Sequence, residues 1–96
     1  MAGDTLGFEE IYVYDSAVSL NRAVYEPAGK SASCALITAE GGDMRFRVDG
    51  SDPTPSTGHL LLEGDMLELK DIYHIQKFRA VKVGSMVGKL SVSYEV

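Results

Sequence analysis

The chain has 96 residues, nine basic and 14 acidic, so its formal net charge is −5. This length allows one domain with a thin core and excludes a large enclosed substrate cavity. The acidic balance argues against nucleic acid as a principal partner, because phosphate binding needs a positive surface. A single cysteine excludes an internal disulfide, and no apolar run approaches the roughly 18 residues that a membrane span needs.

Residues 1–7 contain two glycines and no apolar periodicity, and we expect them to form a flexible N-terminal arm. One domain should then cover residues 8–96. The first four residues lack the basic and apolar regions of a signal peptide, so we expect a protein that is used without secretion.

The first half of the domain contains three predicted strand regions. Phe8–Tyr14 is rich in β-branched and aromatic residues and predicts a strand. Val18–Leu20 predicts a short strand that Ala23–Tyr25 resumes. After a turn at Pro27–Lys30, Ser33–Ala39 carries apolar residues on both parities, as in a central strand covered on both faces.

The middle of the chain pairs a turn with the clearest alternation. Glu40–Asp43 predicts a hairpin turn, because its two glycines tolerate positive φ. In the strand that follows, Met44, Phe46 and Val48 point one way, while Arg45 and Arg47 point the other. This strand should therefore have one face on the core. A loop at 49–58 ends it.

The second half predicts further strands at His59–Leu62 and Met66–Lys70, joined by a turn. Ile72–Ile75 fits either a short strand or a single turn. Lys77–Val83 changes parity midway, which indicates a bulge or a strand covered on both sides. In Lys89–Val96, alternate residues point inward, namely Leu90, Val92, Tyr94 and Val96.

Seven or eight short strands spaced roughly 8–12 residues apart, without a convincing helix, predict an all-β chain. We expect a single small antiparallel β-sandwich of immunoglobulin-like or jelly-roll-like type, with a small barrel as the alternative.

The loop at 49–58 offers hard oxygen donors and therefore suggests calcium. Its D-G-S-D spacing does not match an EF-hand, however. The preferred interpretation is turn chemistry: Asp and Ser side chains accept hydrogen bonds from nearby backbone N–H groups, while Pro53 and Pro55 restrict φ. An ion site in this loop stays an alternative.

Catalytic chemistry is not predicted. Ser56, His59 and Asp65 could form a triad on paper, but no nucleophile motif supports it. His59 and His74 lack the companions of a zinc site, and Cys34 is interpreted as a buried, inert thiol. We therefore predict no enzyme, no catalytic or metal residues and no cofactor.

Two further groups of side chains concern binding. The five tyrosines favour core packing one by one, but several should be partly exposed, where tyrosine suits interfaces. Five basic residues on two predicted strands are interpreted as solvated faces rather than a basic stripe; they are Arg45, Arg47, Lys77, Arg79 and Lys82.

Residues 33–96 carry a familiar pattern, with R-F-R-V-D-G-S-D-P-T, G-H-L-L and F-R-A as its most specific elements. The pattern resembles small proteins encoded among the virion structural genes of tailed bacteriophages and prophages. The D-G-S-D-P-T loop alone is also similar to a loop of immunoglobulin-like domains appended to chitobiase-type carbohydrate enzymes.

The phage resemblance implies a non-enzymatic virion protein that acts by packing against neighbours. Capsid decoration or cementing is the first expectation, and a head–tail or tail accessory position is the second. The implied partners are major capsid, neck or tail proteins and further copies of the chain, and no nucleic acid or membrane. The implied location is the virion, assembled in the bacterial host cytoplasm, with residues 1–10 extending to an adjacent subunit. The chitobiase-like loop implies the alternative, a carbohydrate-binding or adhesion module.

Overall fold

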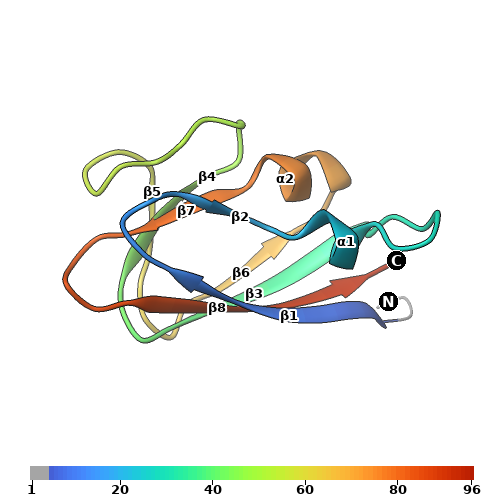
Figure 1. The fold of residues 1–96 in the computed structure, drawn as a ribbon, viewed down its shortest axis with the longest axis horizontal. Helices are drawn as coiled ribbons and strands as arrows, with labels where there is room; N and C mark the ends of the chain where they lie inside the picture. Colours follow the sequence, from blue (N-terminus) through green and yellow to red (C-terminus); the bar gives the residue numbers. More distant parts are fainter. Residues whose placement is uncertain (1–4) are drawn as a thin grey trace.

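The computed structural model describes residues 5–96, and across them eight strands and two short helices form two packed layers (Figure 1). Each layer is an antiparallel sheet of four strands. Sheet A has the order β1 (Thr5–Val13), β8 (Gly88–Glu95), β3 (Cys34–Glu40), β6 (Met66–Leu69). Sheet B has the order β2 (Val18–Ser19), β7 (Arg79–Lys82), β4 (Met44–Arg47), β5 (His59–Leu61). The predicted all-β sandwich is confirmed.

The strand order is that of a jelly roll. Strands pair from the outside of the chain inward: β1 with β8, β2 with β7, β3 with β6, and β4 with β5. The chain is therefore one long hairpin, folded at the loop between β4 and β5 and then rolled up. Two further pairings, β3 with β8 and β4 with β7, hold the roll together. Of the two predicted sandwich types, the jelly roll is the one observed.

Two helices lie in connections that cross between the sheets. In α1 (Arg22–Tyr25), the Asn21 side chain accepts a hydrogen bond from the Ala23 N–H, 3.0 Å away. In α2 (Ile72–Lys77), Asp71 does the same for His74 at 2.8 Å. The prediction of a resumed strand at 23–25 is wrong, because an Asn cap starts a helical turn there despite the β propensity of Val24 and Tyr25.

The core lies between the inward faces of the two sheets. On β8, Leu90, Val92 and Tyr94 are fully buried, and on β4, Met44 and Phe46 are buried, as the alternation predicts. Val96 was predicted inward as well, but it follows the end of β8 and is exposed.

Two expectations about β3 are wrong. Its neighbour in sequence, β4, belongs to the other sheet, so residues 40–43 cross between layers and do not form a hairpin. Its outward face is not covered either, because Leu36 is 41% exposed while Ala35 and Ile37 are fully buried. Apolar residues on both parities fit a covered strand and an exposed apolar face equally well.

At β7 the parity change reflects burial on both sides. Ala80 and Val81 are both buried, although they point to opposite faces. The register with β4 is regular, so no bulge interrupts this pairing.

The start of β1 shortens the predicted arm. Thr5 pairs with Glu95 and Gly7 with Tyr94, so residues 5–7 belong to sheet A and not to an arm. Backbone pairing with β8 holds residues 5–7 in the sheet. The composition of these residues does not reveal this pairing. Residues 1–4 of the predicted arm lie outside the described residues.

Candidate interaction surfaces

The loop at 49–58 forms the tip of the rolled hairpin, and its first aspartate makes a turn. Asp49 Oδ1 accepts hydrogen bonds from the Ser51 N–H at 3.2 Å and from Arg47 Nε at 3.1 Å. Hydrogen bonds from Arg47 and Ser51 lower the pKa of the Asp49 carboxyl below its usual range. Asp49 thus acts as the predicted turn former, with its oxygens used inside the loop.

Most of the basic side chains on the predicted strands contact this loop or another connecting segment. Arg45 Nε donates to the Pro55 carbonyl at 3.0 Å, and Arg45 Nη1 donates to the Gly58 carbonyl at 2.8 Å. Arg79 Nη1 donates to the Phe78 carbonyl, and Lys82 Nζ lies 3.6 Å from Asp15 Oδ1. Arg45 and Lys82 thus connect loops to sheet B, whereas Lys77, which the sequence placed on a strand, lies at the end of α2.

The three residues of the hypothetical catalytic triad, Ser56, His59 and Asp65, make other contacts. Asp65 Oδ2 accepts a hydrogen bond from the Leu62 N–H at 2.9 Å, and the Ser56 hydroxyl lies 3.4 Å from that of Thr54. His59 begins β5, where its ring lies 5.3 Å from that of Phe46. Within Thr5–Val96, no cluster of three or more His, Cys, Asp or Glu side chains is arranged for a metal ion.

Cys34 is not buried as predicted. It lies on the outward face of β3, is partly exposed, and its Sγ donates to Glu68 Oε2 at 3.4 Å. Burial and this hydrogen bond both raise the pKa of the Cys34 thiol. A raised thiol pKa lowers the thiolate fraction and so the nucleophilicity.

The tyrosines divide between core and surface. Tyr25 and Tyr94 are buried, with ring centroids 5.9 Å apart, whereas Tyr12, Tyr14 and Tyr73 are exposed. The expectation that several would be exposed is confirmed.

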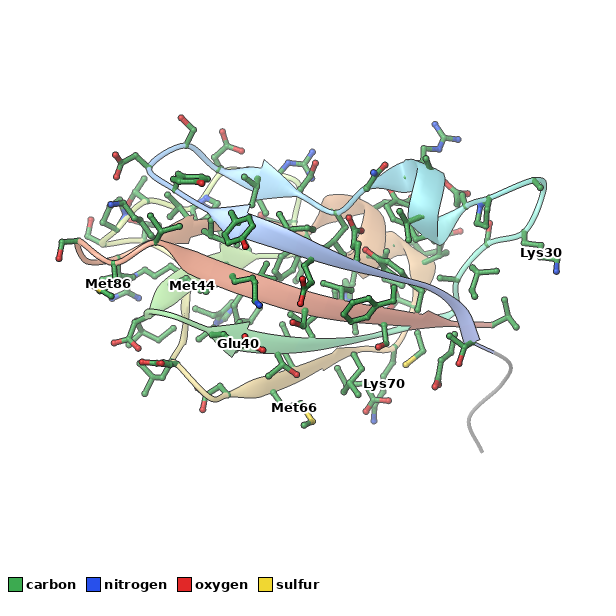
Figure 2. The ribbon with its side chains drawn as sticks, turned by 60° about the horizontal axis from the view of Figure 1, so that its bottom comes forward. Lys30, Glu40, Met44, Met66, Lys70 and Met86 are labelled. Atoms are coloured by element: carbon green, nitrogen blue, oxygen red, sulfur yellow. The ribbon has the colours of Figure 1, made fainter. Side chains whose placement is uncertain are left out.

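The outward face of sheet A carries four large, exposed apolar side chains. Phe8 and Tyr12 project from β1 and are 58% and 57% exposed. Leu36 on β3 is 41% exposed, and Met66 on β6, labelled at the lower edge of the sheet in Figure 2, is 67% exposed. We call these four side chains the apolar outer face. Antiparallel sheets commonly keep the solvent side polar, so we treat this face as a candidate interaction surface.

Small side chains separate the two halves of this face. The register places Ser93 between Phe8 and Leu36, and Ser91 between Glu10 and Thr38. On the same face of β8, Lys89 lies between Tyr12 and Glu40, so serines separate the large side chains only in the middle of the strand.

Charged side chains accompany the apolar outer face. Lys89 Nζ lies 3.4 Å from Glu10 Oε2 and 3.3 Å from Glu40 Oε1, and these contacts raise the pKa of Lys89. Glu68 and Glu95 lie on the same face, with Lys70 Nζ 4.0 Å from Glu68. Four carboxylates against two lysines leave the face with two excess negative charges.

A second surface opens where β5 and β6 form neighbouring edges of the two sheets. They do not pair with each other, and an open groove of about 410 Å³ lies between them. Mostly apolar side chains line it, including Phe46, Leu61, Leu67 and Leu69. Sequence alternation predicts inward residues on each strand, but it does not show which strands end up at an edge.

No helix among the described residues is long and apolar enough to cross a membrane. Comparison of the chain with protein-family models, curated proteins and solved structures finds no match.

Proposed function

We propose that this chain is a non-enzymatic structural subunit of a bacteriophage virion. It acts by packing against neighbouring proteins, as a capsid decoration or cement protein or as a head–tail or tail accessory subunit. The observation that supports this most is the apolar outer face of sheet A, where four large side chains are exposed on one side of the sheet.

The charges of that face favour a particular kind of neighbour. Two excess carboxylates beside apolar side chains suit a surface with an apolar centre and lysine or arginine around it. A second copy would bring the same carboxylates and is disfavoured here. The partner at this face is therefore a different virion protein, such as a capsid or tail protein.

The fold agrees with this role without requiring it. Eight-stranded jelly rolls serve in viral capsids and also in lectins, and one fold hosts many functions. The choice depends on the resemblance of residues 33–96 to phage virion proteins and on the apolar outer face.

Particles from the phage or induced prophage that encodes the chain provide the test. Mass spectrometry should find the protein in purified particles, and electron microscopy should show density that disappears when its gene is deleted. Particles that lack the gene but keep the same density and the same stability would contradict the proposal.

Substitutions test the surface itself. We expect Phe8→Ser combined with Leu36→Ser to weaken binding to gene-deleted particles at least about tenfold, because interface centres lose more than about 1.4 kcal/mol when apolar anchors are removed. Both side chains are exposed, so folding should persist in circular dichroism. Tyr73→Ser on α2 removes an even more exposed side chain elsewhere and should leave binding unchanged.

A carbohydrate-binding module is the second candidate, favoured by the exposed aromatic rings of Phe8 and Tyr12 on the same side of β1. A glycan array distinguishes the carbohydrate-binding module from the virion subunit. Specific hits that Tyr12→Ala abolishes would support this module, whereas an array without hits removes it.

A further inference from the structure

The two sheets end in four edge strands, and three of them are protected against pairing with another chain. An edge strand offers free backbone N–H and C=O groups to any approaching strand. On β1, Glu9 accepts a hydrogen bond from the Asn21 N–H at 3.0 Å, which holds the segment before α1 against this edge. The β2 edge has two residues only.

The β6 edge is protected by charge. Glu68 lies on the outward face of this four-residue strand. If β6 of two copies paired antiparallel within the strand, Glu68 of one copy would lie directly or diagonally opposite Glu68 of the other. Like charges opposite one another destabilise strand pairing.

The β5 edge is three residues long and lacks both the covering segment of β1 and the carboxylate of β6. His59, Leu60 and Leu61 form it, with Gly58 before and Leu62 after, so residues 58–62 contain no carboxylate, no lysine, no arginine and no proline. Leu60 is 52% exposed and Leu62 is 46% exposed. On a chain of net charge −5, a second copy can approach this edge without bringing carboxylates together.

The side chains of β5 also fit their own copies in one antiparallel register. A two-fold axis through Leu60 places Leu60 of each copy opposite the other. On the inward side, His59 of one copy lies opposite Leu61 of the other, next to the groove that both residues line.

We propose that β5 pairs antiparallel with β5 of a second copy and joins the two B sheets into one eight-stranded sheet. The pairing deepens the proposed function, since it specifies how copies of this subunit contact one another. It leaves the apolar outer face of sheet A free for the different virion protein, because the two surfaces belong to opposite sheets.

The test begins with the oligomeric state of the purified full chain, measured by sedimentation velocity and light scattering over a range of concentrations. We expect a dimer whose β5 amides exchange hydrogen more slowly as the protein concentration rises. Leu60→Lys places two ammonium groups opposite each other at the two-fold axis and should weaken dimerisation more than about tenfold.

A charge-pair rescue separates a lost contact from a lost fold. Leu60→Glu alone should also be monomeric, but an equimolar mixture of Leu60→Lys and Leu60→Glu should form a heterodimer. Tyr73→Lys adds the same charge to an exposed position on α2 and should leave the wild-type dimer unchanged. A monomer at every concentration, a dimer insensitive to Leu60→Lys, or no rescue in the mixture would each overturn the inference.

Failure of this inference is distinguishable from failure of the proposed function. A monomer that still binds gene-deleted particles overturns the β5 pairing alone. A β5-dependent dimer that is absent from particles overturns the virion role alone.

Discussion

Tyr94 shows how one edge-strand carboxylate serves several parts of the molecule. Its ring is fully buried between the sheets, and its hydroxyl donates to Glu9 Oε2 at 2.5 Å. The same oxygen accepts the Asn21 N–H, so Glu9 satisfies a buried phenol and also fixes the approach to α1. A buried hydroxyl without a partner is costly, which explains an acidic residue at an inward position of β1.

The buried phenol predicts a loss of stability at alkaline pH. Burial first, and then the hydrogen bond and charge of Glu9, raise the pKa of Tyr94 above its ordinary value. Below about pH 10, Tyr94 is protonated in both the folded and the unfolded chain, and its stabilising effect is complete. Above that pH the unfolded chain loses the proton and the folded chain keeps it. The free energy of unfolding should then fall by about 1.4 kcal/mol per pH unit.

Urea unfolding between neutral and alkaline pH measures this slope. Tyr94→Phe should be about 1–2 kcal/mol less stable at neutral pH and should show a flatter alkaline decline. Tyr73→Phe, at an exposed position, should keep the wild-type slope. An equally steep decline in Tyr94→Phe would contradict this account.

Among the elements, the crossing between β3 and β4 depends on close backbone contact. Gly41 has φ of +84°, and a Cβ placed there would lie 2.8 Å from the Val87 carbonyl oxygen. This close approach places the segment between β3 and β4 directly against the connection between β7 and β8. A positive φ and an immovable backbone neighbour together require glycine.

We therefore expect Gly41→Ala to lower the free energy of unfolding by about 1–3 kcal/mol. Gly84→Ala is the matched control in the neighbouring turn, where a Cβ meets nothing within 4 Å. It should be nearly neutral, or stabilising by up to about 1 kcal/mol through the unfolded state. Thermal unfolding of the two variants compares them, and equal losses would show that the crossing is not the constraint.

At the scale of the whole molecule, the last strand closes the roll. β8 lies between β1 and β3, so its residues supply ladder partners on both sides and three core side chains. Because a jelly roll pairs the first strand with the last, we expect the domain to unfold as one cooperative unit.

Removal of Leu90–Val96 should abolish folding, because β1 and β3 lose their common neighbour and the core is opened. Removal of Val96 alone takes away an exposed residue beyond the strand and should leave the free energy of unfolding within about 0.5 kcal/mol. Circular dichroism and amide proton dispersion compare the two chains. A folded product after removal of Leu90–Val96 would refute the nested pairing.

What the sequence predicted well were local properties. Alternation in Met44–Val48 and Lys89–Val96 located strands and their inward residues, and the D-G-S-D run indicated a turn, because these signals involve neighbours in the chain. Two of the errors show why local signals fail. The cap at Asn21 outweighed the β propensity that follows it, and the pairing of Thr5–Gly7 with β8 is invisible in their composition.

The sequence by itself determined a small all-β chain and the inward side of its most regular strands, because alternation places apolar residues on one side of a strand. Only the tertiary structure decided which strands are edges and which outward faces stay uncovered. The sequence predicts a covered outer face for β3, but Leu36 on that face is exposed. Likewise, no pattern in the sequence distinguishes β5 from the other strands, although β5 lies at a sheet edge. Pairing joins residues far apart in the chain, so no local pattern contains that information.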